Sequence, residues 1–285
     1  MSAQADGYRP LEGKVAFISG GSRGLGAAAA RHLARWGCRV IITYRQEAGE
    51  AALVVAACSD FTPGAKAIQM DLVDEASVRA GFDQILTEED RLDFLIANAA
   101  ATALKPLLAL KMHQIDKTFA ISVRHFILMV QLAFPLLEKS SGRIIGVSGA
   151  DTVGYIPSHG LLGAAKASME SLVHYLACEL GPMGVTAVGV LPGYIDTDSI
   201  RMMTGPLYEP LKKVEIETHP LREAATPEDA AEAIALLCLD EARWLNGQVV
   251  RNDGAGLFAM QGRFFQAAAT GNSGSGDTDA PIIGV

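Results

Sequence analysis

The stretch Ser19-Gly20-Gly21-Ser22-Arg23-Gly24-Leu25-Gly26 decides the fold of this 285-residue chain. A short apolar run at 15–19 precedes it and is typical of a buried strand, and an alanine-rich run at 27–36 is typical of a helix. Glycine allows a tight turn and a close approach of the backbone to a ligand, and N–H groups at a helix start attract phosphate oxygens. The stretch therefore predicts a strand–turn–helix unit that binds the pyrophosphate of a dinucleotide.

The same alternation of strand and helix continues along the chain. Further strands are predicted at 39–44, 67–70, 94–97, 143–147, 185–191 and 248–251, and further helices at 47–57, 76–86, 115–136, 158–180 and 227–238. Strands separated by helices of ten or more residues pair in parallel, with helices on both faces of the sheet. We expect an α/β fold with a single Rossmann-type, doubly wound parallel sheet, in which residues 11–260 form one dinucleotide-binding and catalytic domain.

Residues 198–220 interrupt this alternation, and we predict that they form a substrate lid. They follow a late strand, at the sheet edge where ligands bind, and they contain Met202, Met203, Leu207 and Tyr208. Methionine adapts to irregular ligands, so these side chains indicate an apolar substrate, with core packing of the same residues as the alternative. Residues 1–10 are predicted to be an N-terminal extension without a signal peptide, and 261–285 a C-terminal tail rich in small residues.

Composition excludes several classes of partner. The formal net charge is −8, whereas binding to a phosphate backbone needs a basic face, so we expect no nucleic acid partner. The four cysteines are far apart and no histidine has metal-ligand spacing, which predicts reduced thiols, no metal site and a cytoplasmic location. The longest apolar stretch, 126–137, contains Gln131 and Pro135 and is too short to cross a bilayer, so no membrane partner is expected.

The end of the second strand indicates which dinucleotide binds. An NAD site usually has an acidic residue there for the ribose hydroxyls, whereas this chain has Thr43-Tyr44-Arg45. Arg23 in the turn and Arg45 after the strand could flank a 2′-phosphate, because the planar guanidinium group suits phosphate. The sequence therefore favours NADP(H) over NAD, and two solvated surface arginines are the alternative.

Together these motifs resemble those of the short-chain dehydrogenase/reductase superfamily, from about residue 11 to residue 258. Four segments match patterns of this family. They are the glycine-rich turn, residues 97–100 after the fourth strand, residues 192–197 after the sixth strand, and residues 247–248 with 253–255 at the seventh strand. The resemblance implies an NADP-dependent oxidoreductase that assembles as a homodimer or homotetramer through its two long helices. The implied cofactor-binding residues are Gly20, Ser22, Arg23, Gly24, Leu25, Gly26, Tyr44, Arg45, Asp71, Leu72, Asn98, Ala99, Ala100, Lys166, Pro192, Gly193, Ile195 and Thr197.

The catalytic positions depart from the family pattern. The family lysine is Lys166, but Leu162 stands four residues before it, where the family has its tyrosine acid. The family serine position counts to Gly149, beside Ser148, and the family asparagine of the preceding long helix maps to Ser122. Three of the four standard residues of the family's ketoreductase mechanism are therefore absent.

A second spacing in the superfamily offers another acid. The stretches 91–100 and 195–198 resemble the enoyl-[acyl-carrier-protein] reductase III branch, in which the tyrosine stands seven residues before the lysine. That position is His159 here, about two helical turns from Lys166 on the same face. Tyr155 lies in the loop before the helix, and Ser148 and Asp151 follow the fifth strand. We take Lys166, His159, Tyr155 and Ser148 as catalytic candidates, with Asp151 as a further possible substrate contact.

Three functions are compatible with these residues. The first is NADPH-dependent reduction of an activated C=C, enoyl-thioester-like, or of a C=O, in an apolar acyl or polyketide-like substrate that is free or carrier-bound. The second is a non-redox enzyme on the same fold, an isomerase, dehydratase or cyclase, which the missing tyrosine and serine suggest. The third is a non-catalytic NADP-binding protein. Oxidation of NADPH in step with product formation separates the first from the others.

Overall fold

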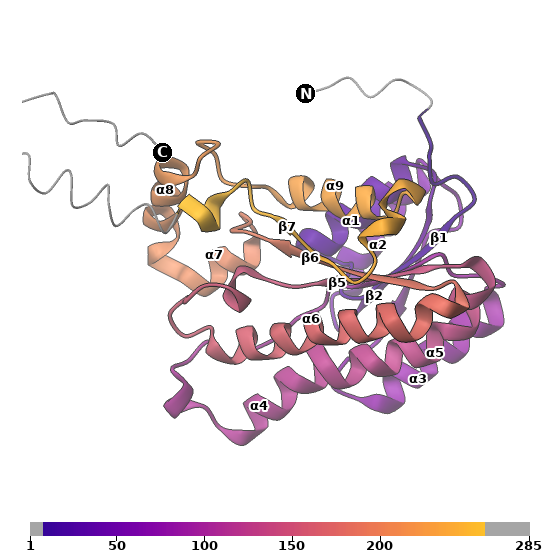
Figure 1. Cartoon of the computed structure of the whole chain (residues 1–285), viewed down its shortest axis with the longest axis horizontal. Coiled ribbons are helices and arrows are strands. Elements are labelled where there is room, and N and C mark those ends of the chain that lie inside the picture. Colours follow the sequence, from indigo (N-terminus) through magenta and orange to yellow (C-terminus); the bar gives the residue numbers. More distant parts are fainter. Residues whose placement is uncertain (1–7, 260–285) are drawn as a thin grey trace, which may run out of the picture.

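A single parallel sheet organises the chain. The computed structural model describes residues 8–259, and within them seven parallel strands pair in the order β3-β2-β1-β4-β5-β6-β7 (Figure 1). Their bounds are Val15–Ile18 (β1), Arg39–Tyr44 (β2), Lys66–Gln69 (β3), Phe94–Ala97 (β4), Arg143–Val147 (β5), Thr186–Pro192 (β6) and Val249–Asn252 (β7). The strand order reverses between β1 and β4, and in such sheets ligands bind at the carboxyl ends of the strands near this point.

Helices cover both faces of the sheet, and each face has its own apolar core. On one face lie α1 (Gly24–Arg35), α2 (Ala48–Ser59) and α9 (Pro227–Leu237); on the other lie α3 (Glu75–Glu88), α5 (His125–Ser140) and α6 (Gly160–Leu180) (Figure 1). The central strands β1, β4 and β5 are fully buried, because helices cover both of their faces, whereas the edge strands β3 and β7 are only partly buried. The predicted doubly wound α/β fold is therefore confirmed.

The predicted long helix at 115–136 differs from the structure in its bounds and regularity. It extends from Met112 to Ser140 and consists of α4 (Met112–Phe119), a π-helical segment η2 (Ala120–Arg124) and α5. By length and composition these 29 residues could cross a membrane, but their most apolar part is 61% buried inside the protein. Packing against α3 and the sheet accounts for this apolarity, as in the core helix of a folded domain.

The predicted lid segment is helical. It forms α7 (Asp198–Thr204), the short turn η5 (Gly205–Leu207) and α8 (Tyr208–Thr218), at the left of Figure 1. The buried hydroxyl of Tyr208 donates to Asp196, and the ammonium group of Lys212 donates to the other oxygen of the same carboxylate. This cluster fixes α8 to the strand end that precedes the lid. The C-terminal tail at 261–285 and residues 1–7 of the predicted N-terminal extension lie outside the described residues.

Candidate active site

The glycine-rich turn between β1 and α1 has backbone geometry that side chains would prevent. Gly20 has φ +66°, a left-handed conformation that favours glycine. A Cβ atom on Gly26 would lie 2.3 Å from the carbonyl oxygen of Gly20, and one on Gly21 would lie 2.6 Å from Cβ of Ile42. The turn is thus packed tightly against its own backbone and against β2, which leaves the start of α1 facing the carboxyl edge of the sheet.

The segment after β4 holds this turn in place. Nδ2 of Asn98 donates to the carbonyl oxygens of Ser19, at 3.1 Å, and Gly20, at 3.0 Å. In return, Oγ of Ser19 accepts the N–H groups of Asn98 and Ala99, both at 3.1 Å. Asn98 and Ala99, predicted from the sequence as cofactor residues, therefore lie against the turn, and Asn98 shapes it directly. Ala100, the next predicted residue, is exposed.

The end of β2 carries the groups predicted to select the dinucleotide. Arg23, which precedes α1, and Arg45, which follows β2, are both exposed. Among residues 8–259 neither forms an ion pair, and the guanidinium of Arg45 lies 3.5 Å from the Gln46 amide oxygen. Nearby, Oδ1 of Asp71 accepts the N–H of Val73 at 2.9 Å, which fixes the loop after β3. Two solvated cations that pair with no acidic side chain among the described residues suit a phosphate group.

The segment after β6 completes the same edge of the sheet. The N–H of Gly193 donates to the carbonyl of Asn252 at 3.1 Å, and a Cβ at Gly193 would lie 2.9 Å from Cβ of Asp253. Ile195 is buried, and the Thr197 hydroxyl accepts the N–H of Ile200 at 3.2 Å, which caps the first helix of the lid. The predicted residues 192–197 therefore connect the sheet edge to the lid.

Lys166 is the most buried charged group of the site. Its side chain on α6 is 4% exposed, and Nζ donates to the carbonyl oxygen of Val147, at the end of β5, at 2.5 Å. Burial lowers the pKa of Lys166 to about 8, while the negative charges of Asp151 and Glu170 oppose this shift. A buried lysine needs a polar partner, and the structure supplies a carbonyl oxygen and two nearby carboxylates.

Ser148 has a carboxylate partner that the sequence analysis missed. Its hydroxyl donates to Oε1 of Glu170, and the Thr152 hydroxyl donates to the same oxygen at 2.8 Å. Glu170 stands four residues after Lys166 on α6, so the i,i+4 spacing was the available signal that both side chains share a helix face. Because the Ser148 proton is directed at Glu170, this hydroxyl is a poor donor to a substrate oxygen in this arrangement.

Asp151 and His159 form a second pair beside Lys166. Oδ2 of Asp151, in the turn η3 (Ala150–Thr152) after β5, lies 3.5 Å from Nδ1 of His159, the residue before α6. The Asp151 side chain is 6% exposed and that of His159 is 23% exposed. Oδ1 of Asp151 is buried and has no hydrogen-bond partner within the described residues. The structure therefore brings Ser148, Asp151, His159 and Lys166 together around the start of α6.

The remaining candidates lie apart from this cluster or lack a donor. Tyr155 is 87% exposed, in the loop before α6, and does not share the burial of the other candidates. Leu162, at the family tyrosine position, is a half-buried apolar residue. The Ser122 hydroxyl is buried in η2 without a hydrogen-bond partner within residues 8–259. π-helical turns often occur at functional sites, which agrees with the position of Ser122 beside α6.

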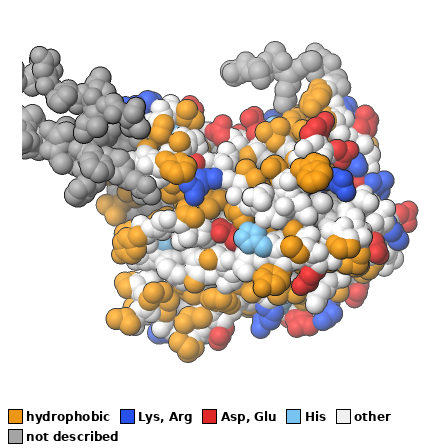
Figure 2. Space-filling view, viewed as in Figure 1, with side chains coloured by type: hydrophobic (Ala, Val, Ile, Leu, Met, Phe, Trp, Pro, Cys, Tyr) orange, Lys and Arg blue, Asp and Glu red, His pale blue; other side chains and the backbone are white. Residues whose placement is uncertain are grey.

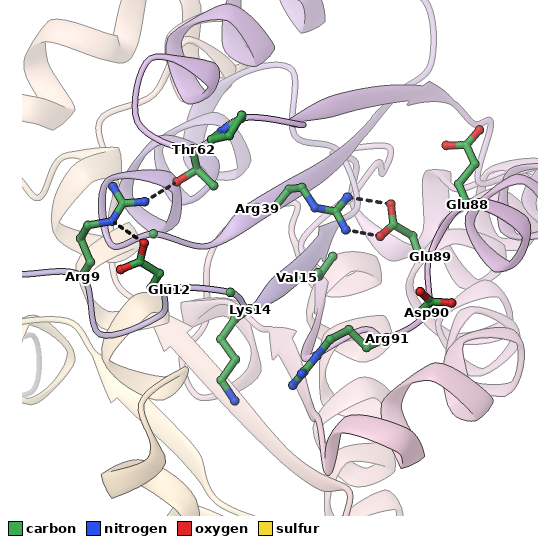
Figure 3. Close-up of a pocket in the computed structure, with 13 residues that line it drawn as sticks. Arg9, Glu12, Lys14, Val15, Arg39, Thr62, Glu88, Glu89, Asp90 and Arg91 are labelled. Carbon is green, nitrogen blue, oxygen red and sulfur yellow. Dashed lines mark hydrogen bonds and ion pairs between the residues drawn. The ribbon is translucent and has the colours of Figure 1, made fainter.

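A separate hollow of about 430 Å³ opens at the amino ends of the strands, opposite the candidate site (Figure 3). The Arg39 side chain faces Glu89 across it, and both are hydrogen-bonded as an ion pair. Lys14 and Arg91 likewise pair with Asp93. These charges neutralise one another, so the hollow is a region of structural ion pairs rather than a ligand site.

Comparisons with known proteins agree with this arrangement. A sequence model for a family described as enoyl-(acyl carrier protein) reductase matches residues 20–256. The chain is 34% identical over 255 residues to 1-cyclohexenylcarbonyl-CoA reductase of Streptomyces collinus, covering 90% of both chains. It is 32% identical to 3-oxoacyl-[acyl-carrier-protein] reductase of Aquifex aeolicus, covering 87% of this chain and 98% of that one.

Two solved structures are also similar to this chain over most of its length. A short-chain dehydrogenase from Burkholderia cenocepacia in complex with NADP superposes with a TM-score of 0.79 at 32% identity, covering 87% of this chain and 99% of that one. An angucycline C-6 ketoreductase with bound NADP also superposes with a TM-score of 0.79, at 27% identity, covering 87% of this chain and 97% of that one.

Proposed function

Because the chain belongs to the short-chain dehydrogenase/reductase superfamily, we propose that it reduces the activated C=C bond of an apolar enoyl thioester with NADPH, with His159 as the acid. The family membership makes the protein an oxidoreductase, and the predicted use of NADP(H) is confirmed by relatives of known structure that bind NADP. We infer the identity of the reduced bond, the substrate class and the catalytic residues.

The residues at the sheet edge suit NADP(H). The N–H groups at the start of α1 can bind the pyrophosphate, and Arg23 and Arg45 can bind the 2′-phosphate. The ammonium group of Lys166 can bind the nicotinamide ribose. A Cβ at Gly26 would fill space against the turn, so the close backbone approach depends on glycine there. When bound, NADPH supplies a hydride, and the protein supplies orientation and charge stabilisation.

The observation that carries the choice of a C=C bond is that neither the family tyrosine position nor the adjacent Ser148 offers a free proton to a ketone oxygen. Ketone reduction generates an alkoxide, which needs a proton at oxygen from a group in contact with it. Leu162 has no proton to give, and the Ser148 hydroxyl is engaged with Glu170. Reduction of a conjugated C=C instead places negative charge on a thioester enolate, whose α-carbon is then protonated. Such a proton can come from His159, at the entrance of α6.

The residues of the chain have distinct roles in this proposal. Lys166 contributes a positive charge that binds the cofactor and favours the developing enolate. His159 donates a proton to the α-carbon and recovers one from solvent, because its side chain is 23% exposed. Ser148, held by Glu170, positions the end of β5. Tyr155, which is largely exposed, is a second candidate donor and requires a movement of its loop to reach the site.

Exposed apolar side chains of η1 (Leu107–Ala109), α4 and the lid suit an apolar acyl group. Leu107 and Leu108 of η1 and Met112 of α4 are exposed, as are Met202 and Leu211 of the lid. Figure 2 shows hydrophobic side chains gathered over the η1 and α4 segment, at the lower left. The Leu107 side chain packs against the start of α6, since a Cβ at Gly160 would lie 3.0 Å from it.

The names of two relatives support an acyl thioester as the substrate. The reductase of Streptomyces collinus is named for a coenzyme A thioester, and that of Aquifex aeolicus for an acyl group on a carrier protein.

The test compares two substrates of equal chain length. The protein is incubated with NADPH and either a 2-enoyl-CoA or the corresponding 3-oxoacyl-CoA, while NADPH absorbance and product mass are followed together. We expect one NADPH consumed per saturated product from the enoyl substrate, and much slower reduction of the oxo substrate. Preferred reduction of the ketone would contradict the choice of bond. Product formation without NADPH oxidation would favour the non-redox enzyme, for which the Asp151–His159 pair supplies an acid and a base.

A further inference from the structure

We propose that Asp151 is a positioning residue that orients His159 and selects its tautomer, so that the two residues together replace the absent serine and tyrosine of the family. This inference rests on the proposed role of His159 as an acid. Three observations carry it: the space made for Asp151 by two glycines, its unpartnered buried oxygen, and its approach to one ring nitrogen of His159.

Two glycines make room for Asp151. A Cβ at Gly149, the position that corresponds to the family serine, would lie 2.8 Å from Oδ1 of Asp151. A Cβ at Gly163, one residue after Leu162, would lie 2.4 Å from the carbonyl oxygen of Asp151. The Asp151 carboxylate therefore occupies the space next to Gly149 that the serine side chain would need. The loss of that serine and the burial of Asp151 are two aspects of one rearrangement.

The Asp151 carboxylate has one oxygen near His159 and one oxygen without a partner. Oδ2 lies 3.5 Å from Nδ1 of His159, whereas Oδ1 accepts no hydrogen bond within the described residues although it is buried. The buried Asp151 carboxylate has the His159 ring as its nearby donor, so a small rotation that shortens the contact between Nδ1 and Oδ2 into a hydrogen bond is favoured. Catalytic hydrogen bonds are often long before ligands bind, and 3.5 Å is within reach of such a movement.

The charges around the pair favour this assignment. Lys166 and Glu170 are the other charged groups of the cluster, and both the Asp151 and Glu170 charges act on Lys166. Glu170 is occupied by the hydroxyls of Ser148 and Thr152, which leaves Asp151 as the carboxylate that faces His159. A carboxylate beside Nδ1 holds a proton on that nitrogen and leaves Nε2 to exchange a proton with the substrate.

The test is a double-variant cycle with a spectroscopic readout. We expect His159→Ala to lower the turnover number by about 10²–10⁴-fold, and Asp151→Asn to lower it within the same range. Because Asp151 acts through His159, the double variant should be no slower than His159→Ala, whereas independent roles would multiply the two losses. Asp151→Glu, which keeps the carboxylate, should recover part of the rate lost in Asp151→Asn. Asp60→Asn, at an exposed position after α2, is the matched control and should keep the full rate.

Nitrogen NMR of the histidine rings in the NADP complex tests the tautomer without turnover. The His159 signals are assigned by their loss in His159→Ala, and we expect Asp151→Asn to shift both ring nitrogens while thermal unfolding stays cooperative. Unchanged ring signals in Asp151→Asn, or multiplied losses in the double variant, would overturn the proposal. If the wild type reduces a different substrate, the cycle is measured with that substrate, so failure of the enoyl assignment is distinguished from failure of the Asp151 assignment.

Discussion

The β1–α1 turn and the β5–α6 segment lie at the same edge of the sheet but differ in how closely they follow the family pattern. In the turn, a Cβ at Gly26 would lie 2.3 Å from a backbone oxygen, so the residue type is fixed by geometry. At the start of α6, the family tyrosine and serine positions hold Leu162 and Gly149. A cofactor site built from backbone tolerates few substitutions, whereas an acid needs only to reach the substrate and can come from another position.

The largest expected effect separates catalysis from binding. His159→Ala should lower turnover by about 10²–10⁴-fold, because a positioned general acid is lost, while NADPH affinity stays within a few-fold of the wild type. Steady-state kinetics and calorimetric titration on the same preparation measure both quantities. His174→Ala, at an exposed position on the same helix, is the control. Equal losses of turnover and of NADPH affinity would show that His159 contributes to cofactor binding as much as to catalysis.

Lys166 should contribute both to cofactor binding and to catalysis. Lys166→Ala should weaken NADPH binding by about 10–100-fold, which corresponds to the loss of a hydrogen bond from a charged group, and turnover should fall as well. Since the pKa of Lys166 is about 8, its positive charge is present below this pH and is lost as the pH rises through it. NADPH affinity should therefore fall above about pH 8 in the wild type and not in Lys166→Ala. Calorimetric titration between about pH 6 and pH 10, roughly two units on either side of this pKa, measures the difference. The same fall in the variant would assign the pH dependence to another group.

A substitution in the glycine-rich turn should weaken NADPH binding and lower the stability of the fold. Gly26→Ala places a methyl group 2.3 Å from the Gly20 carbonyl oxygen, and overpacking of this kind costs about 1–3 kcal/mol of unfolding free energy. NADPH binding should weaken in parallel, because the turn must shift. Denaturant unfolding and calorimetry check both effects. Gly49→Ala is the control, since a Cβ at that helical position meets no atom within 4 Å. Normal stability and affinity of Gly26→Ala would contradict the tight packing.

The smallest expected effect concerns dinucleotide choice. Arg45→Ala should weaken NADPH binding by about tenfold and leave NADH binding nearly unchanged, because an exposed charge contributes modestly to phosphate binding. Titration with both dinucleotides measures the ratio, and the exposed Arg79, on α3, gives the control variant Arg79→Ala. An unaltered preference in Arg45→Ala would leave Arg23 as the remaining candidate for the 2′-phosphate.

The fold was largely predictable from the sequence. The bounds of β2, β4 and β5 agree with the predicted ranges, because buried parallel strands are short apolar runs between helices. The helix predicted at 115–136 is longer and contains the π-helical segment η2, which hydrophobic periodicity does not reveal. The glycine-rich turn between β1 and α1 was also predictable, since its glycines follow from local backbone geometry.

The candidate catalytic cluster was predictable only in part. Lys166, His159 and Ser148 were candidates from their positions in the family pattern, but the Asp151–His159 pair depends on how η3 folds back over α6, which spacing does not give. Glu170 was missed because its partners, Ser148 and Thr152, precede it by 22 and 18 residues and meet it only in the folded chain. Tyr155, an equal candidate in the sequence, is separated from the cluster by its exposure in the loop.

Isotope transfer tests most directly whether this chain carries out conjugate reduction with NADPH. NADPH that carries deuterium at the transferred position is incubated with the protein and a 2-enoyl-CoA, and NMR of the saturated product locates the label. We expect deuterium at the β-carbon and, in a parallel reaction in heavy water, solvent deuterium at the α-carbon. Deuterium from NADPH at a carbinol carbon of an oxo substrate, with no label transferred to the enoyl substrate, would contradict conjugate reduction.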